Sequence, residues 1–419
     1  MLFLLLLPHA WAHADGRLDG VDLQVMEGGE MAVEASFGFV WAQPDETMSW
    51  HCHETITAPD VPITPRYSVS DDGVILGLVP ATEQAREEGL ALYRSTDGCD
   101  WPVVEGLEDI TLAQVAFKPG DAQVALLSTA TLGEGVANGI LRSQDGGQTF
   151  SEVLMVESRL FGSVHFSQAG SAWAGASWSG TDQAWVYMST DGESWSEHEV
   201  PLRDLDGRVQ TLEVVATSPT DPLTAWLVAG PFGSDVLLRT TDGGESFEQL
   251  FHVTGDILDA AVDDAGGVWL AVSGRDFYYA ADGEDFAQVT SAPRGVGLGS
   301  DGDGIWLPLD AVVSGYLVAQ SDDGAFERGL HLSGLELAEC PAESHAVQWC
   351  DPLWPELAGR LPFPPDEDTG LELGDSGPSA PQADSADSAD SVPTRCGCGA
   401  KHSAVLALPL ILAGLRRRH

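Results

Sequence analysis

Basic residues are scarce in this chain of 419 residues. It has 65 aspartates and glutamates against 19 lysines and arginines, and the only lysines are Lys118 and Lys401. The formal net charge of -46 repels the phosphate backbone of nucleic acids and the surface of anionic membranes. We therefore exclude nucleic acid as a partner, and we expect membrane contact only through the C-terminal segment, residues 396–419.

The sequence also lacks convincing helical periodicity and long apolar runs. Only residues 81–89, "ATEQAREEG", are suited to a single helical turn, and the apolar stretch at residues 404–415 is shorter than the roughly 20 residues that span a bilayer comfortably. Hydrophobic residues still make up 43% of the chain, with 13 tryptophans, which is enough for a core. The length suits one large all-β domain or two ordinary domains.

The excess of acidic residues has two interpretations. One is a solubilising surface, and the other is divalent-cation binding by clustered aspartates. The segment "SDGDG" at residues 300–304 is the best local candidate for calcium, but it lacks the remaining ligands of a calcium loop and favours a turn. We therefore expect no metal and no cofactor, with calcium as the alternative.

The N-terminal residues 1–14 have the features of a secretory signal. An apolar run at residues 2–7 is followed by small-residue sites of the A-x-A type, Ala10-Trp11-Ala12 and Ala12-His13-Ala14. The basic residues that usually precede such a run are absent. This segment predicts export, with cleavage near Ala12 or Ala14.

The C-terminal region divides into a linker and a terminal segment. Residues 363–395 consist mainly of Asp, Ser, Pro, Ala and Gly, which predicts a disordered acidic stalk. Residues 396–419 contain Cys396, Cys398, a short apolar stretch and the arginines at 416–418. This order of parts resembles the C-terminal sorting tags of myxobacteria. The resemblance implies processing or lipidation near Cys396 or Cys398, and a location at the cell envelope or surface, outer-membrane-associated or released. A plain single-pass anchor is the alternative.

A short motif recurs along the chain and indicates a repeat. Its copies include "STDGCDW", "SQDGGQTF", "STDGESW" and "TTDGGESF", with weaker copies at either end. We call the segments around their aspartates the aspartate turns, and they lie 40 to 52 residues apart. Their aspartates are Asp45, Asp97, Asp145, Asp191, Asp242, Asp282 and Asp323.

Each repeat unit has the pattern of four short strands. In one unit these are "TLAQVAFKP", "AQVALLSTA", "NGILRS" and "TFSEVLMV", and the next two units repeat the arrangement. Four antiparallel strands per unit are typical of a propeller blade. Residues 15–362 are therefore predicted to form a single all-β, seven-bladed propeller of four-stranded antiparallel blades, with the aspartate turn between the third and fourth strands.

The aspartate turns resemble the Asp-box of sialidase-type (BNR) repeats, S-x-D-x-G-x-T-W, and residues 143–150 fit it best. The resemblance implies a peripheral, structural role, because a catalytic residue would not recur in seven copies. The Asp carboxylate is expected to accept backbone N–H bonds. The closing aromatic residues are expected to pack on the blade: Trp101, Phe150, Trp195, Phe247 and Phe286. Arg94, Arg142 and Arg239 each lie three residues before a box aspartate, and we expect them to be structural too.

Closure of the ring and the cysteines give two further predictions. The segments "LELAECP" and "HAVQWCD" are expected to be two strands that complete the blade begun by "FGFVWAQ" and "MSWHCHE". Disulfides are expected between Cys52 and Cys99 and between Cys340 and Cys350, as is common in exported proteins. Free buried thiols are the alternative. Zinc at Cys52 is disfavoured, because neighbouring strand residues point to opposite faces.

Three classes of function are compatible with these features, and one of them is a purely structural surface protein without a defined ligand, which the sequence does not separate from a binding module. The favoured class is a monomeric, non-catalytic binding or assembly module at the cell surface, with an unknown protein or glycan as its ligand. The alternative is a glycoside hydrolase of the sialidase type. Sialidases need an arginine triad, an aspartate and a Tyr-Glu pair, and the nearest match to their R-I-P motif, "TPRYS" at Arg66, does not fit. No catalytic residue is assigned. A cluster of arginine, tyrosine and acidic residues at the centre of the ring would favour the enzyme.

Overall fold

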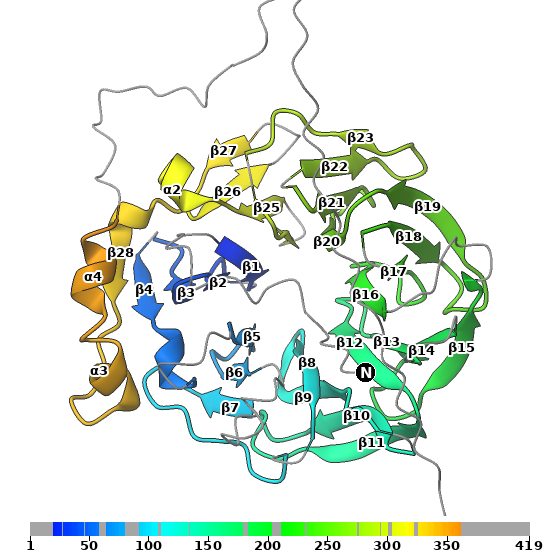
Figure 1. The fold of residues 1–419 in the computed structure, drawn as a ribbon, viewed down its shortest axis with the longest axis horizontal. Helices are drawn as coiled ribbons and strands as arrows, with labels where there is room; N and C mark the ends of the chain where they lie inside the picture. Colours follow the sequence, from blue (N-terminus) through cyan, green and yellow to red (C-terminus); the bar gives the residue numbers. More distant parts are fainter. Residues whose placement is uncertain are drawn as a thin grey trace, which may run out of the picture. The chain divides into compact units, whose positions relative to one another are not determined.

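The computed structural model describes residues 20–361, except 27, 46, 58–63, 80–91, 108–109, 134, 179–182, 203–210, 231–232, 275, 294, 301–303 and 322–325. The described strands form seven antiparallel sheets arranged around a common axis (Figure 1). The seven-bladed all-β propeller predicted from the repeat is therefore confirmed.

The blades follow one another in chain order, and each begins with its innermost strand (Figure 1). Blade 1 contains β1 (Gly20–Val25), β2 (Met31–Ala35), β3 (Gly38–Ala42), β4 (Met48–His51) and β28 (Leu335–Leu337). Blade 2 contains β5 (Arg66–Val69), β6 (Ile75–Leu78) and β7 (Leu92–Ser95). Blade 3 contains β8 (Leu112–Lys118), β9 (Asp121–Thr129), β10 (Ala137–Ser143) and β11 (Ser151–Glu157).

The remaining blades repeat this plan. Blade 4 contains β12 (Leu160–Phe166), β13 (Ala172–Ser177), β14 (Ala184–Ser189) and β15 (Ser196–Val200). Blade 5 contains β16 (Thr211–Thr217), β17 (Ala225–Gly230), β18 (Asp235–Thr240) and β19 (Glu248–Val253). Blade 6 contains β20 (Ile257–Val262), β21 (Val268–Val272), β22 (Asp276–Ala280) and β23 (Ala287–Gln288). Blade 7 contains β24 (Gly299–Ser300), β25 (Ile305–Pro308), β26 (Val318–Ser321) and β27 (Phe326–Arg328).

Hydrophobic patterning explains where each strand lies in its blade. Every residue of β13 and β17 is buried, because these second strands are covered on both faces by neighbouring blades. The outer strand β11 is exposed or half-buried throughout. The predicted strands of blades 3, 4 and 5 agree with the observed ones. The core is accordingly a ring of apolar layers between blades.

The inner edge of each blade would leave backbone N–H groups unpaired without further contacts. Side chains from one blade accept these donors on the next, at distances of 2.8 to 3.1 Å. The acceptor and donor residues are Gln24 and Val69, Ser68 and Phe117, Gln114 and Val164, Ser163 and Val214, and Asp259 and Leu298. Polar residues on the inner strands thus hold adjacent blades together.

The prediction for ring closure was wrong in its details. Blade 1 already has four strands from the N-terminal region, because residues 20–35 supply β1 and β2. The C-terminal region adds only β28, which pairs in parallel with β4 as a fifth strand. The predicted strand "HAVQW" is instead the helix α3 (His345–Trp349). Its N-cap is Ser344, whose side chain accepts the Val347 N–H at 3.3 Å, and this local bond favours a helix.

The four cysteines form two disulfides as predicted, but the predicted pairing was wrong. The bonds are Cys52–Cys350 and Cys99–Cys340, with Cα separations of 5.3 and 5.5 Å. The helix α3 follows Cys340 and lies against the η1 turn (His53–Thr55), which places Cys350 beside Cys52. Cys340 follows β28 and reaches the aspartate turn of blade 2. Both bonds therefore fasten the C-terminal segment to blades 1 and 2.

Besides α3, three short helical elements follow or interrupt the last strands: α2 (Ala311–Ser314), η3 (Leu332–Gly334) and α4 (Trp354–Ala358). In the part of the chain that the structure describes, none of the helices has the length and apolarity required to cross a bilayer. The predicted signal at residues 1–14, the linker at 363–395 and the terminal segment with Cys396 and Cys398 lie outside the described residues.

Candidate functional site

Three groups of residues are candidate functional sites, and the first is the aspartate turns. Each described aspartate follows the third strand of its blade, in the outer half of the blade: Asp45, Asp97, Asp145, Asp191, Asp242 and Asp282. Asp323 falls outside the described residues. None of these six side chains is at the axis, so they do not form one site.

Hydrogen bonds show what an aspartate turn does locally. Asp145 Oδ1 accepts the N–H groups of Gln148 and Thr149 at 3.0 and 2.9 Å. The buried Ser143 hydroxyl donates to the same oxygen at 2.8 Å and accepts the Gly147 N–H at 2.9 Å. Asp97, Asp191 and Asp242 repeat this pattern. A single carboxylate thus closes a tight turn between two strands.

These bonds favour the ionised carboxylate. N–H bonds from Ser194 and Glu193 lower the pKa of Asp191 to about 2. The hydroxyl and N–H of Ser246 lower the pKa of Asp242 to about 2. A catalytic acid at neutral pH needs a raised pKa instead, so the turns are unsuited to acid catalysis.

The aromatic residues that close the turns lie against the blade cores. Trp101 is 2% exposed, and its Nε1 donates to the Gly98 carbonyl at 2.9 Å. The other four are partly buried against the apolar layers between blades: Phe150, Trp195, Phe247 and Phe286.

The three arginines link consecutive aspartate turns. Arg94 Nε donates to the Gly146 carbonyl at 2.7 Å. The Arg142 guanidinium pairs with Glu193 at 2.8 Å, and that of Arg239 pairs with Asp282 at 3.3 Å. In each case the arginine is on the third strand of one blade and its partner is on the turn of the next. The contacts are those expected of structural arginines.

The second group lies on the inner strands, apart from one member on β2, and we call it the axial cluster. Its members come from five different blades and influence one another electrostatically across the centre of the ring: Asp22, Glu34, Arg66, His165, Glu213 and Asp259. Asp22 and Glu34 are directly opposite each other in the β1–β2 register. Like charges in such a pair repel, so at least one carboxyl is favoured in its neutral form.

Burial dominates the electrostatics of the axial cluster. Glu34 is 7% exposed, and burial, together with the charge of Asp22, raises its pKa to about 8. Burial also raises the pKa of Asp259 and Glu213, and the charge of Arg66 opposes both shifts. The Asp22 side chain has a solvent-accessible surface, but the ring of blades surrounds it. The loss of bulk water around its carboxyl raises its pKa. Burial lowers the pKa of His165 to about 4, which leaves the ring neutral.

Sequence reasoning missed the axial cluster, except for Arg66, which was noted and set aside. Its members are single polar residues within ordinary strand patterns, and no motif distinguishes them from other acids. Tyr67 follows Arg66, and its hydroxyl is 3.1 Å from His53 Nδ1. Tyr67 packs in the apolar layer between blades 1 and 2, so no described tyrosine lies among the arginine and the acidic residues of the axial cluster.

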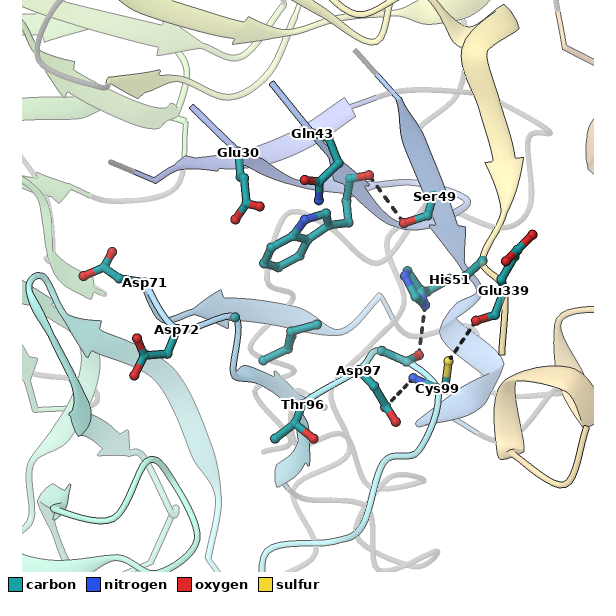
Figure 2. A pocket seen from close by; sticks show the side chains of 15 residues that line it. Glu30, Gln43, Ser49, His51, Asp71, Asp72, Thr96, Asp97, Cys99 and Glu339 are labelled. Atoms are coloured by element: carbon teal, nitrogen blue, oxygen red, sulfur yellow. Dashed lines mark hydrogen bonds between the residues drawn. The ribbon is translucent and has the colours of Figure 1, made fainter. Parts of the chain in front are cut away.

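The third group lines an open cavity of about 470 Å³ between blades 1 and 2, which we call the rim cavity (Figure 2). Turns of blades 1 and 2 contribute Glu30, Gln43, Asp71, Asp72 and residues 96–99. Antiparallel strands place all of these turns at the same face of the ring. Strand β4 supplies Ser49 and His51, and the segment after β28 supplies Glu339.

Hydrogen bonds order the walls of the rim cavity. The Gln43 amide is oriented so that both of its neighbours are satisfied. Its oxygen accepts the Trp41 indole N–H at 2.6 Å, and its nitrogen donates to the Glu30 carboxylate at 3.1 Å. Asp71 accepts the Gly120 N–H at 2.7 Å, which ties this wall to blade 3. The disulfide of Cys99, itself a lining residue, fixes the wall that bears Glu339. The cavity is therefore preformed.

His51 contributes an unusual polar atom to this cavity. The ring is 6% exposed, and Nδ1 lies 2.9 Å from the Gly98 carbonyl, which only accepts, so Nδ1 carries the hydrogen. Burial lowers the pKa of His51 to about 4, against the opposing effects of the Gly98 bond and Asp97. The neutral ring leaves Nε2 as an acceptor, and no described residue donates to it.

No metal site is evident in the described part of the chain. No group of three or more histidine, cysteine or acidic side chains there is placed to hold a cation. The predicted candidate at residues 300–304 lies largely outside the described residues. Cys52 is in a disulfide, and the rings of His51 and His53 make separate hydrogen bonds.

Comparisons with known proteins support the fold alone. No protein-family model and no curated protein matches the sequence. Among solved structures, a GH74 xyloglucanase from Xanthomonas campestris is similar at 15% identity and a TM-score of 0.50, over 74% of this chain and 52% of that one. An ancestral GH74 enzyme is similar at 15% identity and a TM-score of 0.54, over 74% and 46%. The chain thus spans about half the length of each of these propeller enzymes.

Proposed function

We propose that this protein is an exported, surface-tethered propeller that acts as a non-catalytic binding or assembly module, with the rim cavity as its ligand site. In this proposal the aspartate turns are Asp-box repeats. Residues 1–14 direct export, and residues 396–419 provide the tether or sorting tag. The ligand is a protein or a glycan at the cell surface, and the module acts as a monomer.

The observation that supports this proposal best is the construction of the rim cavity. Its walls come from blade 1, blade 2 and the C-terminal segment, which are joined by disulfides spanning 298 and 241 residues. Its volume lies in the range of about 300–1,000 Å³ that is usual for ligand pockets. Rigid walls reduce the entropic cost of binding.

Site-specific crosslinking on the cell surface tests this proposal. A photo-crosslinking residue at Asp72, on the cavity wall, is expected to capture a defined ligand. The same residue at Asp264, on the equivalent exposed turn of blade 6, is expected to capture none. Equal capture from both positions would contradict a ligand site at the rim cavity.

A glycoside hydrolase is the second candidate, and the axial cluster is what favours it. Asp22 and Glu34 form a carboxyl pair, and a raised pKa like that of Glu34 is typical of a general acid. The two GH74 neighbours add only the fold, because their identity to this chain is 15%. Turnover of xyloglucan or an aryl glycoside, abolished by Glu34→Gln, would establish this candidate and refute the non-catalytic one.

A further inference from the structure

The polar lining of the rim cavity is almost entirely made of hydrogen-bond acceptors. Acidic side chains line it from three sides, and no lysine or arginine is among its lining residues. The donors of Trp41 and Gln43 are already used within the wall. An anionic ligand would meet repulsion here, and a neutral glycan would find few donors for its oxygen atoms.

An acidic lining alone does not define a ligand, but His51 adds independent information. Its ring is 6% exposed, and its Nε2 is an acceptor without a donor among the described residues. Because this nitrogen has no donor from the protein, it favours a ligand that brings an N–H or O–H group. Figure 2 shows His51 at the wall between Ser49 and Cys99, facing the open space.

Trp41 restricts the ligand further. Its indole N–H is used by Gln43, and its ring lines the cavity. An aromatic ring attracts a guanidinium or ammonium group that lies over its face. A guanidinium also brings five N–H donors in a planar fork, which matches a cavity rich in acceptors.

We propose that the rim cavity binds a basic segment of a partner protein, and that an arginine side chain of this segment lies near Trp41 and His51, between the acidic side chains of Asp72 and Glu339 on opposite sides of the cavity. This inference rests on the proposed binding function and specifies the class of ligand. The cavity is open at the ring face and is far larger than a metal ion needs, so a peptide segment can enter. The net charge of -46 would accelerate its approach.

Calorimetric titration of the full-length protein with two peptides tests this proposal. Acetyl-Arg-Arg-Arg-amide is expected to bind with one-to-one stoichiometry at physiological salt. The citrulline counterpart keeps the shape but lacks the charge, and it is expected to bind at least tenfold more weakly. Equal affinity for the two peptides, or no binding of the arginine peptide, would overturn the proposal.

Matched variants separate the cavity from the general acidity of the surface. Asp72→Asn with Glu339→Gln is expected to weaken binding of the arginine peptide at least tenfold. Asp264→Asn with Glu245→Gln removes the same charge from exposed positions on blades 6 and 5 and is expected to change affinity less than twofold. Equal losses in the two double variants would show diffuse attraction and overturn the proposal.

Two further measurements make the outcome specific. Trp41→Phe, with an unchanged melting temperature, is expected to weaken the arginine peptide about threefold and to remove part of the fluorescence change on binding. If a neutral oligosaccharide bound the cavity and Trp41→Phe weakened that binding, the proposal of a cationic ligand would be overturned. The proposed binding function would still stand. Glycoside hydrolysis lost in Glu34→Gln would overturn the proposed function itself.

Discussion

Blades 3 to 5 and the closing sector, which comprises blades 1 and 2 with residues 335–361, are held in the ring by different interactions. Blades 3 to 5 each have four strands, and the turns of blades 3 and 4 accept bonds from the third strand of the preceding blade. The closing sector has a five-stranded blade, a three-stranded blade and two disulfides. It also contains the rim cavity and Asp22, Glu34 and Arg66 of the axial cluster.

This difference shows that a propeller has two requirements. Each blade must be positioned against its sequence neighbours, and the two ends of the ring must be joined over a long sequence separation. A blade in the middle of the repeat contacts neighbours that are adjacent in sequence, so short motifs suffice to position it. The closing sector joins segments about 300 residues apart, which pays a large loop-closure entropy. Disulfides and the parallel strand β28 offset that cost, and the junction they create is where the rim cavity lies.

Loss of the two disulfides is expected to produce the largest effect. Replacing Cys52, Cys99, Cys340 and Cys350 with alanine should lower the free energy of unfolding by about 4 kcal/mol or more, because each bond closes a very long loop. Denaturant unfolding should show the loss. Protease digestion should cleave first near residues 335–361, while blades 3 to 5 stay protected. Uniform digestion of all blades would contradict the distinction between the two regions.

Truncation of a core side chain in blades 3 to 5 should lower the free energy of unfolding slightly less than loss of the disulfides. Trp173 on β13 is 0% exposed, and its Nε1 donates to the Ser171 hydroxyl at 3.0 Å. Trp173→Ala should destabilise the protein by about 4 kcal/mol, since it leaves a cavity and removes the indole donor to Ser171. Trp178 follows the same strand and is 44% exposed, so Trp178→Ala is the control and should cost less than about 1 kcal/mol. Similar thermal shifts for the two variants would show that Trp173 is not a core residue.

The axial cluster should make stability depend on pH in the closing sector. Glu34 has a folded pKa of about 8, above its usual value, so the folded state keeps a proton that the unfolded chain has lost. Stability should therefore fall as pH rises from about 4.5 to 8. Glu34→Gln should reduce this dependence, because Asp22, Glu213 and Asp259 still contribute to it, and should be more stable than the parent at pH 9 by an amount on the order of 3 kcal/mol.

The control for this prediction is Glu336→Gln, which changes an exposed acid on β28. Its unfolding free energy should follow that of the parent from pH 4 to 9. Parallel profiles for Glu34→Gln and the parent protein would mean that Glu34 is ionised in the folded state at neutral pH.

The smallest expected effect on the free energy of unfolding comes from changes in equivalent aspartate turns, one in blade 3 and one in the closing sector. Ser143→Ala removes a buried hydroxyl that bonds both Asp145 and the Gly147 N–H and should cost about 1–2 kcal/mol. Ser95→Ala removes the same bonds in blade 2 but should cost less, because the Cys99 disulfide already fixes that turn. Chemical denaturation measures both, with the exposed Gln144→Ala as the control. An equal cost at the two positions would show that the disulfide does not support the turn.

Sequence reasoning predicted the strands of blades 3 to 5 well and those of the closing sector poorly. Strand alternation and the spacing of the aspartates located blades 3 to 5, because each unit repeats the same local pattern. The strands β1 and β2 precede the first and most degenerate aspartate turn, at Asp45, and were missed. The helix α3 was mistaken for a strand, although its N-cap Ser344 offered a local signal.

The repeat alone determined the fold class, the number of blades and the positions of the aspartate turns, since these follow from hydrogen bonds within a few residues of one another. Only the tertiary structure decided the disulfide pairing, the axial cluster and the rim cavity. Each of these depends on which distant segments meet when the ring closes. Four cysteines permit three pairings, and any of the 65 acidic residues could in principle face the axis. Strand register and the packing of α3 against η1 select one arrangement, and no pattern local to the sequence encodes that choice.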